Sequence, residues 1–276
     1  MSVLLLLLFL SYISFNNAYD ENLSKHCVDL SQASYCVSSI DKWTCITCDS
    51  SIKLEYIVEN SDSKAIQGYD SLTNTLFTAF RGSSNLHNWI ENIQIHKISP
   101  YNDTSIEIEK GFYKAYNYIK PEIMDNLFYL SKKYNTNKLL ITGHSLGAAM
   151  ATIMTYDILK LYSDYKIDFL FNFGSPRVGN KEFVKDFNNY DITSYRVTHY
   201  YDMVPHVPEE FLDYHHISNE IWYNRDNSKY KICNDYDNQE DNSCSNQCAP
   251  LHCTSTSDHL YYLNVTMGND DGNNCY

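Results

Sequence analysis

The pattern of apolar and polar positions divides most of the chain into alternating strands and helices. Short apolar or β-branched runs predict strands at Leu54–Val58, Ala65–Tyr69, Thr75–Phe80, Lys138–Thr142, Ile167–Phe173 and Ser194–Tyr201. Helical spacing predicts helices over Gly111–Lys133 and from Ser145 to about Tyr162, and Pro121 within the first predicts a kink or a second start. This alternation indicates an α/β fold with a mostly parallel central sheet that helices cover on both faces. Functional residues of such sheets gather at the carboxyl ends of the strands.

The first 18 residues differ from the rest because they are almost wholly apolar up to Phe15 and end at the small residue Ala18. This stretch is too short for a membrane span and predicts a cleaved signal peptide over residues 1–18, with an uncleaved anchor as the alternative. Of the 276 residues, 276 − 18 = 258 remain, which suits one domain over residues 19–276. No later run reaches the roughly 20 apolar residues of a span. We therefore expect a soluble monomer that is secreted, or held in the lumen of a secretory or lysosome-like compartment.

The net charge of −13 lies entirely after residue 18, because the first 18 residues carry no charged side chain. Such an acidic chain is a poor partner for nucleic acid or for anionic membranes, since both repel it. Any contact with lipid must therefore be apolar.

Nine cysteines form two clusters near the ends of the chain, and behind a signal peptide they predict disulfides. The spacing of Cys45 and Cys48 also fits a zinc site, but secretion argues against zinc. We therefore expect no metal and no cofactor. An odd number leaves at least one cysteine free or paired with another molecule. Asn22, Asn102 and Asn264 begin glycosylation sequons.

The segment Gly143-His-Ser-Leu-Gly147 matches Gly-x-Ser-x-Gly, with a predicted strand before it and a helix after it. This setting makes Ser145 the candidate nucleophile, because a serine on a tight strand-to-helix turn needs small residues two positions before and after it. The helix start also supplies amides for an oxyanion. The alternative is a glycine-flanked serine that merely caps the helix.

A serine nucleophile needs a histidine base, and the base needs a carboxylate that orients it. In this fold the chain order is serine, acid, histidine. Asp202 directly follows a predicted strand and is the preferred acid, whereas Asp191 and Asp213 lack that position. Three nearer candidates are expected to be surface charges: Asp157, Asp164 and Asp168. Chain order alone does not choose the base among His206, His215, His216, His252 and His259.

Beyond these motifs the chain resembles the fungal-type (class 3) triacylglycerol lipases from about Ser34-Tyr-Cys36 to its C-terminus. Seven ordered blocks carry the resemblance: Trp43–Asp49, Phe80–Trp89, Lys110–Phe112, Thr142–Gly147, Gly174–Gly179, Asp202–Pro208 and Asp258–Tyr262. The resemblance implies an α/β-hydrolase fold and a triad of Ser145, Asp202 and His259. His206 then becomes a structural neighbour of the acid. Ala148 departs from the family, which often has a third glycine there.

The resemblance also implies the oxyanion hole and the disulfides. The amide of Leu146 and the amide and hydroxyl of Ser83 would bind the oxyanion. The implied pairs are Cys36 with Cys275, Cys45 with Cys48, and Cys233 with Cys244. Cys248 and Cys253 are extra in this chain and fit a pair across a short loop, and Cys27 remains by arithmetic.

After Ser83, the apolar residues Leu86, Trp89, Ile90 and Ile93 follow helical spacing, where the family carries its lid. Such a lid would cover the cleft when closed and meet a lipid surface when open; the alternative is an ordinary core helix. We therefore expect a triacylglycerol lipase that acts on lipid esters at a lipid–water interface through an acyl-enzyme. The rivals are a feruloyl esterase or a phospholipase or galactolipase on this fold, and a non-catalytic lipid carrier.

Overall fold

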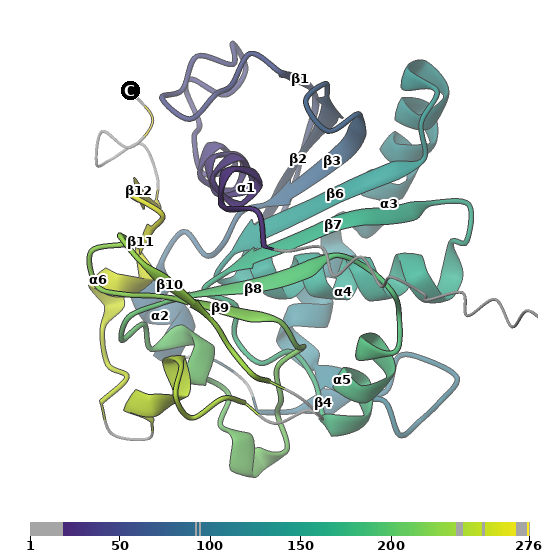
Figure 1. Ribbon diagram of the computed structural model, residues 1–276. Coiled ribbons are helices and arrows are strands. Elements are labelled where there is room, and N and C mark those ends of the chain that lie inside the picture. Colours follow the sequence, from purple (N-terminus) through teal and green to yellow (C-terminus); the bar gives the residue numbers. More distant parts are fainter. Residues whose placement is uncertain are drawn as a thin grey trace, which may run out of the picture.

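The central feature of the computed structural model is an eight-stranded sheet in the order β1-β2-β3-β6-β7-β8-β9-β10 (Figure 1). The structure describes residues 19–91, 93, 95–235, 240–249, 252–268 and 275. The strands are β1 (Ile52–Asn60), β2 (Ser63–Asp70), β3 (Thr75–Phe80), β6 (Lys138–His144), β7 (Lys166–Phe173), β8 (Ser194–His199), β9 (Glu220–Tyr223) and β10 (Tyr230–Ile232). The middle strands from β3 to β9 run parallel, and antiparallel pairs close both edges. The predicted α/β-hydrolase architecture is therefore confirmed.

Four of the helices of the described chain cover the two faces of this sheet. The helices are α1 (Glu21–Ala33), α2 (Leu86–Glu91), α3 (Lys110–Tyr134), α4 (Leu146–Leu161), α5 (Lys181–Asn188) and α6 (Thr256–His259). Helix α1 lies on one face, and α3, α4 and α5 lie on the other (Figure 1). Each face has its own apolar core, because strand residues alternate between the two faces. Among the described residues, no helix combines the length and apolar character that crossing a membrane requires.

Short elements complete the loops around the sheet. They are β4 (Lys97–Ile98), β5 (Ile108–Glu109), β11 (Tyr261–Tyr262), β12 (Val265–Thr266) and the 3-10 turns η1 (Val204–His206), η2 (Glu210–Leu212) and η3 (Ser245–Cys248). The sequence pattern did not predict α1, α5, β9 or β10. The predicted signal peptide, residues 1–18, lies outside the described residues.

Of the two alternatives predicted at Pro121, a kink or a second start, the second start is wrong, because helix α3 runs without interruption through this residue. Its buried face, which includes Ile119 and Ile123, packs in the core and offsets the cost of about 3 kcal/mol that an internal proline imposes. Asp157 is not a surface charge: its side chain is fully buried and accepts from Tyr101 Oη at 2.6 Å and Lys120 Nζ at 2.5 Å. The helix α4 that carries it is buried nearly all round, so its polar positions also face protein.

Four disulfides join the segments that the cysteine clusters bring together. The pairs are Cys36–Cys275, Cys45–Cys48, Cys233–Cys244 and Cys248–Cys253, and Cys27 is a buried free thiol. These are the pairs that the resemblance and the remaining cysteines implied.

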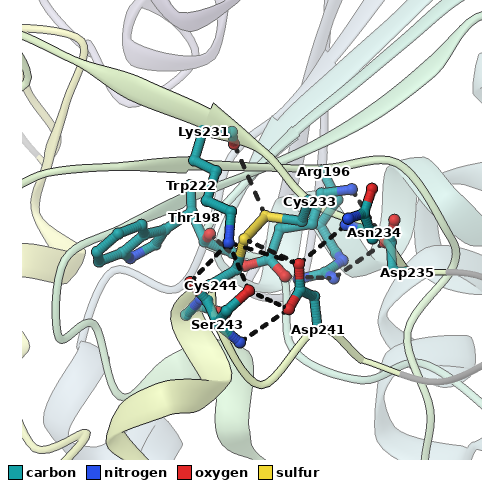
Figure 2. Close-up of a disulfide and its surroundings, with 12 residues drawn as sticks. Arg196, Thr198, Trp222, Lys231, Cys233, Asn234, Asp235, Asp241, Ser243 and Cys244 are labelled. Atoms are coloured by element: carbon teal, nitrogen blue, oxygen red, sulfur yellow. Dashed lines mark hydrogen bonds and ion pairs between the residues drawn. A yellow bond between two sulfur atoms is a disulfide. The ribbon is translucent and has the colours of Figure 1, made fainter.

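The Cys233–Cys244 loop packs beside a buried ionic cluster at the β8–β9 end of the sheet (Figure 2). Asp241 holds the loop together by accepting the N–H groups of Asn234 at 2.9 Å and Ser243 at 2.8 Å. Behind it, Arg196 lies 3.3 Å from Glu220 and 3.7 Å from Asp235. The disulfide thus closes the loop, and the ion pair of Asp235 with Arg196 joins the loop to the sheet.

Candidate active site

Ser145 occupies the tight turn between β6 and α4, at the carboxyl end of a central strand. Its backbone has φ 60° and ψ −131°, a strained conformation that L-residues rarely adopt. Its side chain makes no capping hydrogen bond to the helix, so the helix-cap interpretation of this serine fails. Such strain persists where the surrounding structure enforces it, and here it places the hydroxyl at the start of α4.

The glycines around Ser145 are required by close backbone contact. A Cβ on Gly143 would lie 2.4 Å from the carbonyl of Gly147, and a Cβ on Gly147 would lie 2.2 Å from the Phe80 oxygen. Both distances are far below van der Waals contact. The spacing of Gly-x-Ser-x-Gly therefore reflects how closely α4 approaches β3 and β6.

Asp202 and His259 form a buried pair at the same edge of the sheet. The Nδ1 atom of His259 lies 2.8 Å from Asp202 Oδ2 and 3.0 Å from Oδ1. Asp202 also accepts the Tyr262 hydroxyl at 2.5 Å and the Val204 N–H at 2.8 Å. Burial alone would raise the pKa of Asp202, but His259 and these donors hold it below its usual value. The acid is therefore ionised and its partner's Nδ1 is a donor.

Chain order left five histidines as candidates for the base, and in the structure these histidines differ in their partners. Of the five candidate histidines, His259 is the one bonded to Asp202. The others lie elsewhere: His206 beside Cys248, His215 on Asp213, His216 on the Pro205 carbonyl, and His252 on the surface. Burial and Arg177 lower the pKa of His206 to about 4. Neither alternative acid is suitably placed, because Asp191 is exposed and Asp213 pairs with Lys97.

Gly174, at the end of β7, makes room for the acid and base and was not singled out by the sequence. It has φ 56°, and a Cβ there would lie 2.9 Å from Asp202 Oδ2, His259 Cε1 and His259 Nδ1. Its position at the start of the block Gly174–Gly179 was the sequence feature that could have indicated this role. Tyr262 was likewise present in the block Asp258–Tyr262 without an assigned role.

Ser145 and His259 line one cleft of about 290 Å³, together with Ser83 and Leu86. Both Ser145 Oγ and His259 Nε2 are buried and have no hydrogen-bond partner among the described residues. Buried polar atoms normally have partners, and exceptions concentrate at reactive sites. An unpaired hydroxyl and an unpaired imidazole nitrogen in one cleft can exchange a proton with a bound substrate.

Ser83 and the predicted lid lie at the rim of this cleft. The Ser83 hydroxyl donates to the Asn85 carbonyl at 3.1 Å and accepts its N–H at 3.3 Å. Helix α2 follows at once, with Leu86 on the cleft. Trp89, Ile90 and Ile93 are half-buried, and Trp89 stacks on Phe112 with ring centroids 6.1 Å apart. Leu146 is the first residue of α4, where N–H groups lack intrahelical partners.

Two other features lie apart from this chemistry. A larger hollow of about 1050 Å³ between α3 and the turn after α4 lies at the amino ends of the parallel strands, opposite the triad residues. His206 with Cys248 and Cys253 has ligand-like spacing, but these sulfurs are joined in a disulfide and cannot ligate a metal as thiolates.

Comparison with known proteins agrees with this geometry. A family model described as lipase (class 3) matches residues 77–212. A lipase of Rhizomucor miehei is 31% identical over 247 residues, which cover 87% of this chain and 67% of that protein. A secreted mono- and diacylglycerol lipase of Fusarium solani is 32% identical over 153 residues, 55% of this chain and 45% of that protein.

A solved triacylglycerol lipase, described as having a serine protease triad at its catalytic centre, superimposes with a TM-score of 0.81 at 28% identity. The match covers 90% of this chain and 96% of that chain. The chain therefore belongs to the class 3 lipase family, a family of carboxylic ester hydrolases that use a serine triad.

Proposed function

We propose that this protein is a secreted triacylglycerol lipase with Ser145 as nucleophile, His259 as base and Asp202 as the acid that orients the base. The observation that carries the proposal is the cleft in which Ser145 Oγ and His259 Nε2 lie unpaired while His259 Nδ1 is held by Asp202. A carrier protein would gain nothing from a strained serine beside an oriented base.

The reaction follows from these positions. Ser145 Oγ attacks the ester carbonyl while its proton passes to His259 Nε2, and Asp202 stabilises the imidazolium that forms. The proton then passes to the leaving glycerol oxygen, the ester bond breaks, and an acyl-Ser145 ester remains. Water, deprotonated by the same histidine, cleaves that ester and releases the fatty acid.

The tetrahedral intermediate needs donors for its oxyanion, and we assign these to the Leu146 amide and to Ser83. The Leu146 amide belongs to the helix N-terminus, where the dipole favours negative charge. In the present conformation the Ser83 hydroxyl is bonded to Asn85, at the base of α2. A movement of α2 would therefore also change what Ser83 can bind.

The size of the cleft supports a mobile lid. At about 290 Å³ it is at the lower limit of sites for small ligands, about 300–1,000 Å³, and a long-chain triacylglycerol needs more room. Leu86 lines the cleft, and none of the residues of α2 is fully buried. We infer that α2 moves aside at a lipid surface and turns Leu86, Trp89, Ile90 and Ile93 towards it.

Secretion is supported by the apolar N-terminal stretch and by four disulfides, which persist in oxidising compartments. A relative named as a secreted lipase agrees with this. The three sequon asparagines, Asn22, Asn102 and Asn264, are exposed, so glycans there would point to solvent.

The proposal is tested by labelling with a serine-directed alkyl phosphonate and by a hydrolysis panel of triolein, diolein, phosphatidylcholine and a feruloyl ester. We expect one label per chain, on Ser145, the fastest release from triolein, and a sharp rise in rate once the ester exceeds its solubility limit. The variant Ser145→Ala is the control and should give neither label nor product. A wild type without label would refute the nucleophile, and faster hydrolysis of another ester would refute the substrate class.

A further inference from the structure

A second histidine, His144, packs against the ring of His259, and the mechanism above does not use it. His144 is the last residue of β6 and is 1% exposed. Its ring packs against that of His259 in a tilted arrangement, with centroids 4.5 Å apart and planes 34° apart. A buried imidazole in contact with the catalytic one must either compete with it for protons or support it.

The hydrogen bonds of His144 decide between these roles. Its Nε2 lies 2.8 Å from the backbone carbonyl of His259, and its Nδ1 lies 2.7 Å from the Tyr35 hydroxyl. A carbonyl oxygen can only accept, so Nε2 carries the proton and donates. In the neutral ring Nδ1 is then an acceptor, and the Tyr35 hydroxyl is its donor. The His259 carbonyl therefore sets the tautomer of His144, and the Tyr35 hydroxyl stabilises that tautomer by donating to Nδ1.

The surroundings keep this ring uncharged. Burial, then the nearby His259, lower the pKa of His144 to about 3, although the hydrogen bond to the His259 carbonyl and the charge of Asp202 act in the opposite direction. Tyr35 remains a protonated donor, because burial raises its pKa well above the usual value. Tyr262, whose ring centroid lies 5.8 Å from that of His144, donates to Asp202 and has a raised pKa as well.

The Tyr35 hydroxyl is tightly packed among its neighbours. A Cβ on Gly82 would lie 2.1 Å from the Tyr35 hydroxyl, 2.7 Å from the His144 carbonyl oxygen and 2.9 Å from Ser145 Cβ. The hydroxyl is thus wedged between the segment after β3 and the nucleophile's turn. Cys36, the next residue, is tied to Cys275, which anchors this part of the chain.

We propose that His144 and Tyr35 are positioning residues: Tyr35 stabilises one tautomer of the neutral His144 ring, and His144 Nε2 holds the backbone of His259. Asp202 fixes the ring of His259 through Nδ1, so the bond to its carbonyl fixes the other end of the same residue. Together they leave Nε2 of His259 directed at the cleft. This inference rests on the proposed triad but not on the identity of the lipid substrate.

The test uses the full-length mature protein and a short-chain nitrophenyl ester below its solubility limit, so that lid movement at an interface does not enter. His144→Phe keeps an aromatic ring but removes the donor, whereas His144→Gln offers an amide N–H to His259 and an amide oxygen to Tyr35. A misplacement of about 1 Å at a catalytic group costs roughly 100-fold. We expect His144→Phe to lower kcat about 10- to 100-fold with KM within about twofold, and His144→Gln to recover most of that loss.

The pH profile separates support from direct proton transfer. The acid limb of kcat/KM should be the same in the wild type and in His144→Gln, because the ring of His144 stays neutral across that range. A shifted limb in His144→Gln would mean that His144 itself titrates in the reaction, and would overturn the proposal. So would a kcat for His144→Phe within twofold of wild type, or a His144→Gln enzyme as slow as His144→Phe.

Tyr35→Phe provides a second test if a variant at position 144 does not fold. It should lower kcat about 3- to 10-fold, and Tyr35→Phe combined with His144→Phe should be no slower than His144→Phe alone, because both act through one chain of bonds. The control is Tyr156→Phe, which removes a hydroxyl bonded to Asp186 away from the cleft. An unchanged Tyr35→Phe enzyme, or losses that multiply in the double variant, would contradict the proposal. Phosphonate labelling of the wild type tests the nucleophile independently of all these rates.

Discussion

The ion pair between Arg177 and Glu240 gives the sharpest stability prediction. Arg177 Nε and Nη2 donate to the two oxygens of Glu240 at 2.6 and 2.8 Å, and Nη1 donates to the carbonyls of His206 at 2.8 Å and Pro208 at 3.0 Å. The two side chains are only 3% and 7% exposed. Arg177 therefore holds the loop that follows Asp202 through these hydrogen bonds, and the carboxylate of Glu240 neutralises the charge of its guanidinium.

The variant Glu240→Gln keeps the shape of the side chain but leaves the guanidinium charge uncompensated. Breaking a buried pair in this way costs about 3–5 kcal/mol. For a chain of this size, about 2–4 °C of Tm is lost per kcal/mol, so we expect a drop of roughly 6–20 °C in thermal unfolding followed by circular dichroism. The control Glu21→Gln breaks the exposed pair with Lys25 and should change stability by no more than about 1 kcal/mol.

The pH dependence of unfolding gives the refuting result. Burial alone would raise the pKa of Glu240, but Arg177 holds it far below its usual value. A lowered pKa in the folded state contributes stability that is complete above the unfolded pKa of about 4.3 and is lost as the pH falls below it. The gap between wild type and Glu240→Gln should therefore be widest near neutral pH and should close in acid. Equal Tm values at neutral pH, or a gap that does not narrow, would refute this account.

Three further outcomes follow from single positions. Gly174→Ala places a methyl group against Asp202 and His259 and forces φ 56° on alanine. We therefore expect kcat to fall roughly 100-fold and the free energy of unfolding to fall by about 1–2 kcal/mol. A kcat within threefold of wild type would contradict the close contact of Gly174 with Asp202 and His259. Ser83→Ala should lower kcat about 100- to 1,000-fold, because a donor to the oxyanion is lost. We expect little loss of stability, because the hydrogen bonds of the Ser83 hydroxyl within the described part of the chain are to the Asn85 backbone. An unchanged kcat would remove Ser83 from the oxyanion hole. Cys27 should resist iodoacetamide in the native protein and react, as one thiol per chain, in denaturant without reductant; two or more reactive thiols would contradict the disulfide assignment.

Much of the α/β core was predictable because its signals are local. Strands such as Thr75–Phe80 appear at their predicted bounds, since a buried strand is a short run of apolar residues. The turn around Ser145 was also predictable, because its two glycines lie within five residues of sequence, although the contact that requires Gly147 is with Phe80 of β3. The second helix start at Pro121 and the surface position of Asp157 were predicted wrongly for the opposite reason: long-range packing outweighed the local preference of each residue.

The sequence by itself determined the tight turn around Ser145, the mostly parallel sheet and the position of Asp202 shortly after a strand, because each depends on neighbours along the chain. Only the tertiary structure pairs His259, among the five histidines, with Asp202, since their hydrogen bond joins residues 57 positions apart. The contact between Tyr35 and His144 was likewise not predictable from the sequence. Tyr35 and His144 are separated by 109 positions and meet only because α1 and its following turn pack against the end of β6. Hydrogen bonds between such distant segments leave no periodic trace in the sequence.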